Sequence, residues 1–393
     1  MAVPLTGKII GFATQGAGGD DEARLRALLS KLPAQIYPFD KKKKWRNIGG
    51  LLKMISKEKP DLLIMEGTGL FGGIAVLLAK LFKKIPYVVS SGDSIAPFIQ
   101  KKRPLLAPLF SLYEKRLYKR SIGFIGWTPY LVGRALSYGT TFGVTAAGWA
   151  PFELAEDEAQ TARSRVRETF GIPEDAIVIG IVGSLSWNKR IGYCYGYELI
   201  RSIQKMVRDD LYVMIVGDGT GKAKLQELAR GQKNIIFTGR VSREEVPAYL
   251  AAFDLASLPQ SVDQVGSFRY TTKVSEYLAA GLPIVTGTIP MAYDLTEVGF
   301  YKMIGGTPWS DTYCNRLSVF LQTIDRAAIA DKSSRIPRTL PLFNKETQVE
   351  RITSFVQDIL QSLADGNWRS EPQEAKVEDY GYRGVSANEY KEA

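Results

Sequence analysis

The sequence contains no histidine in its 393 residues. This absence excludes Ser-His-Asp hydrolysis, zinc sites built on histidine and any histidine general base. The two cysteines, Cys194 and Cys314, give neither a metal-ligand spacing nor a disulfide framework. No apolar run approaches the roughly 20 residues of a transmembrane helix. The opening segment, MAVPLTGKIIGFAT, predicts no signal peptide, so we expect a cytoplasmic protein in a reducing compartment.

Positive charge is concentrated in the first part of the chain. Residues 1–150 contain 23 Lys and Arg against 9 Asp and Glu, whereas the whole chain contains 51 and 41. The basic residues cluster at 41–46, 101–103 and 113–120. Such patches attract phosphates of nucleic acids, anionic lipids or diphosphate substrates. Because no RNA-recognition or helix-turn-helix signature accompanies them, we expect no nucleic-acid partner.

Strand-like and helix-like segments alternate along the chain. The short apolar runs KIIGFAT, AQIYPF, DLLIME, PYVVSS and SIGFIGWT alternate with helical patterns, and the alternation restarts after residue 170 with AIVIGIVGSL. This pattern predicts parallel sheets covered by helices. We therefore expect an α/β protein with two Rossmann-like domains that face each other across a cleft. The predicted divisions are residues 1–165, residues 166–365 and a polar tail over 366–393.

Ligands of such folds bind beside the carboxyl ends of the strands. A glycine-rich loop with Gly16, Gly18 and Gly19 follows the first predicted strand, and the backbone there can approach a phosphate or an acceptor closely. The spacing is not that of a dinucleotide fingerprint, and a plain tight turn explains these glycines equally well. Asp93 follows the fourth strand and is the only acid between residues 67 and 113, so it is a candidate site residue.

The most informative segment is SFRYTTKVSEYLAAGLPIV, residues 267–285. It predicts a polar loop, then a helix that carries Glu276 and ends before Gly281 and Pro283. Lys273 lies one helical turn before Glu276 and can pair with it or reach a phosphate. An isolated glutamate in such a helix is commonly a surface residue that complements the helix dipole. The order of the surrounding residues favours a binding role instead.

The segment resembles the signature helix of GT-B glycosyltransferases, specifically the retaining family 4. The resemblance implies that Glu276 grips the ribose of a sugar nucleotide, with the donor also contacted by Lys273 and by Tyr270, Thr271 and Thr272. No pyridoxal-binding lysine context of a phosphorylase accompanies the segment.

Further motifs of the family follow other strands of the second half. A pattern like G-x-L-x-x-x-K occurs with Gly183 and Lys189, and Arg190 follows directly. The resemblance implies that Lys189 and Arg190 neutralise the diphosphate leaving group. The segment FTGRVS implies that Arg240 and Val241 contact the base, although backbone contacts leave the base open. UDP- or GDP-linked sugars are the expected donors.

The chain departs from the family pattern in two places. Many members carry a second glutamate eight positions before the first, where this chain has Phe268. The nearby Asp263 is an alternative contact for sugar hydroxyls. The family also often uses a histidine of the first domain at the donor sugar, and the comparable segment here offers Asp93.

The resemblance implies a hexosyltransferase that retains configuration and requires no metal or cofactor besides the nucleotide-sugar. The departing phosphate oxygen can take the acceptor proton, so no general base is required. Inversion would need such a base, with Asp93 the best choice, and the residues themselves do not decide between the two. A nucleotide-sugar epimerase of the same shape, or a non-catalytic basic protein that binds lipid or nucleotide, are the alternatives.

The acceptor is left open among lipids, glycans, small molecules and proteins. Residues 103–120 combine Leu105, Leu106, Leu109, Phe110, Leu112 and Tyr113 with basic residues. This pattern fits a helix lying on an anionic membrane surface, and the apolar positions also fit a core helix with a solvated basic face. Residues 41–46 add to the membrane interpretation. Peripheral contact with the inner face of a membrane is therefore one expectation.

Overall fold

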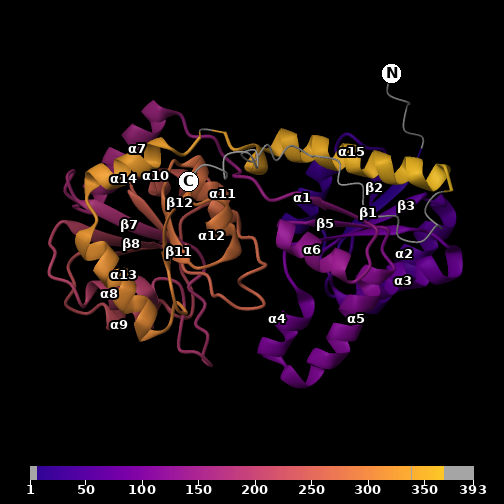
Figure 1. Cartoon of the computed structure of the whole chain (residues 1–393), viewed down its shortest axis with the longest axis horizontal. Coiled ribbons are helices and arrows are strands. Elements are labelled where there is room, and N and C mark those ends of the chain that lie inside the picture. Colours follow the sequence, from indigo (N-terminus) through magenta and orange to yellow (C-terminus); the bar gives the residue numbers. More distant parts are fainter. Residues whose placement is uncertain (1–6, 338, 367–393) are drawn as a thin grey trace, which may run out of the picture.

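The computed structural model describes residues 7–337 and 339–366, which form two α/β units side by side (Figure 1). The first unit is built on a parallel six-stranded sheet in the order β2-β1-β3-β4-β5-β6. Its strands are β1 (Ile9–Ala13), β2 (Ala34–Ile36), β3 (Leu62–Glu66), β4 (Tyr87–Ser91), β5 (Gly123–Gly126) and β6 (Phe142–Thr145). Its helices are α1 (Asp20–Leu28), α2 (Lys44–Glu58), α3 (Leu70–Lys83), α4 (Ile95–Lys102), η1 (Pro104–Leu106), α5 (Ala107–Lys119) and α6 (Pro129–Ser137).

The second unit repeats this plan with a parallel sheet in the order β12-β11-β10-β7-β8-β9. Its strands are β7 (Ile177–Val182), β8 (Leu211–Val216), β9 (Ile235–Gly239), β10 (Leu255–Leu258), β11 (Ile284–Gly287) and β12 (Phe300–Ile304). Its helices are α8 (Tyr197–Ile203), α9 (Lys222–Leu228), α10 (Val246–Ala251), α11 (Thr272–Ala279), α12 (Pro290–Asp294), α13 (Asp311–Thr323), α14 (Arg326–Ser334) and η2 (Pro341–Phe343).

The central strands are buried on both faces, which explains their continuous apolar sequences. Every residue of β1, β3 and β4 is buried, as expected for parallel strands covered by helices on both sides. The predicted α/β class with two Rossmann-like units is confirmed. The strands β6 and β12 were not predicted from the sequence. Both lie at sheet edges and are only partly buried, as are the edge strands β2 and β9, which were predicted. The apolar residues of β6 are only Phe142 and Val144, and Lys302 interrupts β12, so neither has a continuous apolar run.

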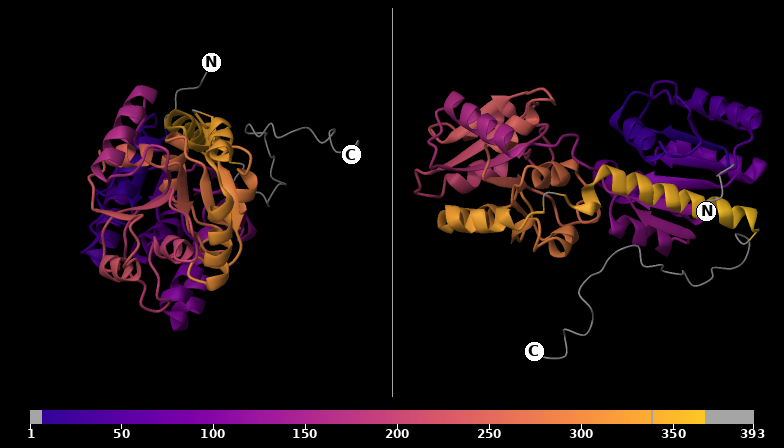
Figure 2. Two further views of the ribbon diagram at one scale, coloured as in Figure 1. Left: turned by 90° about the vertical axis from the view of Figure 1, so that its left-hand side faces the viewer. Right: turned by 90° about the horizontal axis from the view of Figure 1, so that it is seen from above.

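Two helices connect the units in ways that the sequence pattern did not indicate. Helix α7 (Glu156–Thr169) packs against the second unit, where Arg163 and Arg167 both form ion pairs with Asp254. Helix α15 (Lys345–Ala364) returns to the first unit and packs along it (Figures 1 and 2). Its buried residues Ile352, Val356 and Ile359 join the core beside β1 and α1.

The division at residues 165 and 365 stays a prediction. Helix α15 packs on the first unit, to which this division does not assign it, and the boundary at 165 cuts α7, which packs on the second unit. The predicted polar tail falls outside the described residues from 367 onward. Across residues 7–337 and 339–366, we find no helix whose length and apolar character would let it cross a bilayer.

A fully buried carboxylate lies in the core of the second unit. Glu198, on α8, accepts hydrogen bonds from the Tyr193 hydroxyl at 3.0 Å and the Ser257 hydroxyl at 3.1 Å. Burial outweighs these hydrogen bonds and raises the pKa of Glu198 to about 7. The folded protein therefore binds this proton more tightly than the unfolded chain does. Its contribution to stability is fully present below about pH 4.5 and is lost as the pH rises through about 7.

We expect Glu198→Gln to flatten the pH dependence of the free energy of unfolding. The amide resembles the protonated carboxyl and carries no charge, so the variant gains up to about 3 kcal/mol relative to the wild type between about pH 5 and pH 8. Urea unfolding at the two pH values measures this difference, with Glu168→Gln on the exposed face of α7 as the control. A parallel pH dependence in the wild type and the Glu198 variant would contradict the assignment.

Candidate functional site

A cleft separates the two units at the carboxyl ends of their strands. It contains a cavity of about 1290 Å³ between α4 of the first unit and the loops that follow β7 and β10 of the second. Polar and charged side chains contribute much of its wall. Among the predicted site residues, those that line it are Arg190, Tyr270, Thr271, Thr272 and Lys273. The cavity is therefore assembled from both units.

The loop that follows β10, residues 259–271, attaches the second unit to the first. The Ser94 hydroxyl donates to the Gln264 carbonyl at 2.9 Å, and the Thr128 hydroxyl donates to the Phe268 carbonyl at 2.8 Å. The Phe268 side chain packs against the core of the first unit. Phe268, which stands where many family members have an acid, thus anchors the loop through apolar packing.

Ion pairs reinforce this attachment. Asp263 pairs with Lys101 at 2.5 Å, and Arg269 pairs with Asp93 at 2.9 Å. Although burial opposes it, the Lys101 ammonium and the backbone amides of the loop hold the pKa of Asp263 at about 2. Burial raises the pKa of Asp93, with Arg269 acting against it. The Arg190 guanidinium also spans the cleft and donates to the Lys101 carbonyl at 2.8 Å.

Helix α11 places the predicted donor-binding residues on the wall of the second unit. Thr271 is its N-cap and Glu276 lies in its middle, slightly farther along than the first turn expected from the sequence. The Lys273 ammonium lies 4.9 Å from the centre of the Tyr195 ring. It also lies against Gly183, where a Cβ atom would approach the Lys273 side chain to 3.0 Å. A side chain at position 183 would therefore displace Lys273.

Charges of alternating sign extend from α11 across the cleft. Burial raises the pKa of Glu276, and the Lys273 ammonium, the Thr272 hydroxyl and the Arg243 guanidinium act in the opposite direction. Arg243 in turn pairs with Asp20 of the first unit at 2.8 Å. Sequence reasoning missed Arg243, three positions after Arg240. The sequence signal that could have identified Arg243 is its position as a cation in the loop that follows β9.

The remaining predicted residues of the second unit lie outside the cavity. Lys189 and Arg240 are exposed, and Val241 packs against the second core.

Tyr270 lines the cavity but is buried, and its hydroxyl forms a hydrogen bond with Ser275 at 2.8 Å. Its ring packs against Trp127 of the first unit at 5.9 Å. Tyr270 thus also stabilises the contact between the units.

The glycine loop of the first unit has an acidic surrounding. Gly16 and Gly18 adopt positive φ values of 111° and 76°, as a tight turn requires. The Gly18 amide already donates to the Glu22 carboxylate at 3.2 Å. The first turn of α1 carries Asp20, Asp21 and Glu22, whose charges oppose the binding of a phosphate at this helix N-terminus. The surroundings of the loop favour an acceptor more than a diphosphate.

Buried charges that the sequence analysis did not single out lie beneath this loop. Arg24 pairs with Glu66 at 2.7 Å, and its guanidinium stacks 4.3 Å from the Trp127 ring. The Trp127 indole donates to the other Glu66 oxygen at 3.2 Å. Burial, together with the charges of Glu66, Asp20 and Asp93, raises the pKa of Asp21 to about 6. Glu66 could have been identified as an acid at the end of a buried strand.

No group of three or more Asp, Glu, Cys or His side chains within residues 7–337 and 339–366 is arranged to hold a metal ion.

Comparison with known proteins agrees with this geometry. Residues 176–302, which contain α11 and Gly183, match the model of the family described as glycosyl transferases group 1. This segment therefore resembles a glycosyl transferases group 1 domain. A putative teichuronic acid biosynthesis glycosyltransferase, TuaH of Bacillus subtilis, is 26% identical over 238 residues, which cover 58% of this chain and 57% of TuaH. This chain therefore aligns with little more than half of that relative.

Solved structures show the same fold over almost the whole chain. Anabaena HepE, in complex with UDP and glucose, has a TM-score of 0.60 at 15% identity and covers 91% of this chain and 99% of its own. A putative UDP-N-acetylglucosamine 2-epimerase from Listeria monocytogenes has a TM-score of 0.54 at 12% identity. The alignment covers 93% of this chain and 98% of the epimerase chain. The chain has the GT-B fold.

We expect Asp20→Asn to lower the pKa of Asp21, because it removes a neighbouring negative charge that favours the protonated carboxyl. Carbon-13 labelling of aspartate, followed by an NMR titration, measures the midpoint, which we expect at about 6 in the wild type. The exposed Asp157→Asn on α7 is the matched control. An Asp21 midpoint that is the same in all three proteins would refute the coupling.

Proposed function

We propose that this chain is a retaining family 4 glycosyltransferase that moves a sugar from a nucleotide-sugar to an acceptor without a metal ion. The observation that carries the proposal is the position of α11. This helix lies inside the matched domain, borders the cavity between the units, and brings Lys273 against Gly183 at the end of β7. The Lys273 ammonium, the N-terminus of α11 and the backbone at Gly183 therefore lie together. A diphosphate can bind where a cation, free amides of a helix N-terminus and an unobstructed backbone meet.

On the donor side, the Glu276 carboxylate accepts hydrogen bonds from the ribose hydroxyls. Its partial burial strengthens these bonds, and the neighbouring Lys273 and Arg243 favour its ionised form. Lys273 and the first amides of α11, near Thr271 and Thr272, contact the diphosphate. The backbone at Arg240 and Val241 receives the base. UDP- and GDP-linked sugars are the proposed donors.

Arg190, which lines the cavity, neutralises the leaving diphosphate together with Lys189, which is exposed outside the cavity in this structure and has to turn toward it. In the reaction, the bond between the sugar C1 and the β-phosphate oxygen breaks, and a bond from the acceptor oxygen to C1 forms. The acceptor proton passes to the departing phosphate oxygen on the same face of the sugar, which retains configuration. The cations stabilise the charge that develops on that oxygen and replace a metal ion in this role. In this structure, Arg190 donates to the Lys101 carbonyl, so it has to exchange that bond for the diphosphate.

The acceptor approaches from the first unit. The Gly16–Gly19 loop and the carboxyls of Asp21 and Asp93 border this side and can orient acceptor hydroxyls by accepting hydrogen bonds. Asp93 is paired with Arg269, and this pairing supports a positioning role better than that of a free general base. We propose that the protein acts in the cytoplasm, with the basic first unit against an anionic membrane surface.

An epimerase is the second candidate, because a putative nucleotide-sugar epimerase shares the fold. The transfer of the sugar to an acceptor distinguishes the two activities. Conversion of a nucleotide-sugar to its epimer without any acceptor would favour the epimerase.

We expect Glu276→Gln to lower kcat/KM for the donor by about ten- to hundredfold, because the neutral amide loses the charge-assisted hydrogen bonds and has one acceptor oxygen instead of two. Release of the nucleoside diphosphate from UDP- and GDP-sugars measures it. Glu227→Gln, an exposed glutamate on α9, is the control and should retain full activity. An unchanged kcat/KM in a folded Glu276 variant would refute the proposed ribose contact.

For Arg190→Ala, we expect kcat to fall more than the KM of the donor rises. The charge on the diphosphate grows as the glycosidic bond breaks, so a neutralising cation acts mainly in the transition state. Steady-state kinetics with the donor varied separates the two constants. The exposed Arg335→Ala, at the C-cap of α14, serves as the control. A change in KM alone would show that Arg190 only binds the donor.

A further inference from the structure

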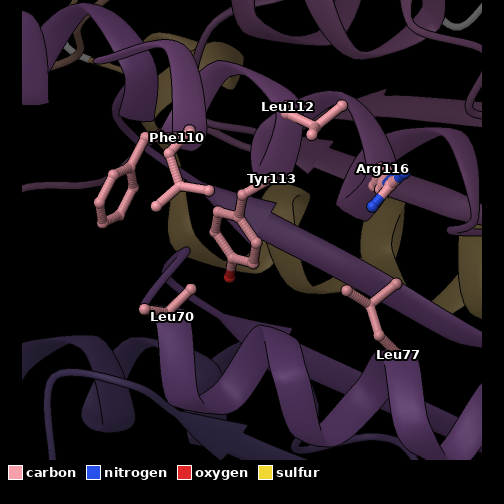
Figure 3. Close-up of a pocket in the computed structure, with 7 residues that line it drawn as sticks. Leu70, Leu77, Phe110, Leu112, Tyr113 and Arg116 are labelled. Atoms are coloured by element: carbon pink, nitrogen blue, oxygen red, sulfur yellow. The ribbon is translucent and has the colours of Figure 1, made fainter. Parts of the chain in front are cut away.

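An apolar groove lies between α3 and α5 on the surface of the first unit. It encloses about 250 Å³. Leu70 and Leu77 of α3 form one wall, and Phe110, Leu112 and Tyr113 of α5 form the other (Figure 3). Leu109 and Arg116 complete the lining, so a single cation borders an otherwise aliphatic and aromatic surface.

The floor of the groove is built around a glycine. A Cβ atom at Gly73 of α3 would lie 1.8 Å from the Tyr113 hydroxyl, so only glycine lets this ring insert between the helices. The Tyr113 hydroxyl donates to the Thr68 and Gly69 carbonyls at 3.3 and 3.2 Å. Its polar group is satisfied there, and the ring presents an apolar face to the groove.

Large apolar side chains continue outward from the groove into solvent. Leu109 is 63% exposed and Leu105, on η1, is 94% exposed; Phe82, at the end of α3, is 75% exposed. Helices α4 and α5 protrude from the first unit, while α3 lies in its body (Figure 1). Exposed apolar surface that is continuous with a groove marks an interaction site, and the exposed Leu109 and Leu112 both line this groove.

The same elements carry basic residues. Lys83 and Lys84 end α3, residues 101–103 end α4, and Arg116 and Lys119 lie in the last turn of α5. A surface that combines exposed leucine and phenylalanine with cations is complementary to an anionic lipid bilayer. The sequence pattern of residues 103–120 left a membrane helix and a core helix open. The structure divides the segment, since Tyr113 and Phe110 pack inward while Leu105, Leu109 and Leu112 are exposed.

One end of the groove lies beside the acceptor side of the cleft. Leu70 directly follows the loop 67–69, which leads from Glu66 at the end of β3 into α3. The Gly69 amide donates to the Thr14 hydroxyl at 3.2 Å, and Thr14 precedes the glycine loop. A molecule that occupies the groove at Leu70 therefore has the acceptor-side residues within a short reach.

We propose that the groove between α3 and α5 binds the apolar chain of a lipid-linked acceptor held in an anionic membrane. The chain lies between the leucines, the headgroup with the group to be glycosylated extends past Leu70 into the cleft, and the basic residues of the same elements contact the anionic lipids of the surrounding membrane. This inference rests on the proposed function, since it names the acceptor class of the same reaction.

The experiment measures binding of the chain separately from binding of the donor. The probe is dansylundecanoic acid, an anionic fluorescent acyl chain, and alkyl phosphates of six, eight and ten carbons displace it below their micellar concentrations. We expect each added methylene to strengthen displacement by up to about fourfold. The variant Leu109→Asn/Leu112→Asn should weaken probe binding at least tenfold; both side chains are largely exposed, so the fold should persist. Val319→Asn, an exposed apolar residue on α13, is the matched control and should bind normally.

A second arm tests the membrane and the cleft. Flotation with vesicles that contain phosphatidylglycerol should carry the wild type and the Val319 variant but not the double variant, and pure phosphatidylcholine vesicles should carry none. Stabilisation by a nucleotide-sugar should be the same in all three proteins, because the groove is remote from α11.

Displacement that does not depend on chain length, or equal probe binding by the double variant, would overturn the proposal. A change of the double variant from dimer to monomer in light scattering would instead assign the groove to a second copy of the chain and would also overturn it. Loss of the nucleotide-sugar effect in every protein would contradict the transferase function instead.

Discussion

The attachment of the loop after β10 to the first unit is the contact on which the site depends. Phe268 packs into the first core, and hydroxyls of Ser94 and Thr128 hold the loop backbone. The loop leads directly into α11, so the same contact that joins the units also sets the position of Lys273 and Glu276 relative to the acceptor side. Apolar packing and neutral hydrogen bonds maintain this contact at high ionic strength, where exposed ion pairs such as Arg243–Asp20 contribute little.

The charges of the cleft are paired across it. Arg243 and Arg269 of the second unit pair with Asp20 and Asp93 of the first, whereas Lys101 of the first unit pairs with Asp263 of the second. Residues 1–150 are strongly basic overall, and many of their basic side chains lie on α3, α4 and α5. At the end of α4, Lys101 and Lys102 line the cavity, so the first unit brings both acidic and basic side chains to the cleft.

The sequence predicted the fold well where strands are buried on both faces, because their apolar runs are continuous. It failed for the edge strands β6 and β12, whose apolar runs are short or are interrupted by Lys302. The sequence identified α11 and Gly183 because the residues of each motif follow one another along the chain. It did not identify Arg243, Glu66 or Asp21, since their roles depend on contacts between residues far apart in the chain, such as Arg24 with Glu66. The return of α15 to the first unit is equally non-local. The tight turn at Gly16 and Gly18 was recognisable, but its acidic surroundings became evident only from the packing of α1.

The central claim is that the cleft binds a nucleotide-sugar between the two units. Thermal unfolding in the presence of a panel of UDP-, GDP-, ADP- and CMP-sugars tests it most directly, because a ligand that binds only the folded protein raises its midpoint. We predict that one UDP- or GDP-sugar raises the midpoint in proportion to the logarithm of its concentration. If no member of the panel changes the midpoint at millimolar concentration, the account is contradicted.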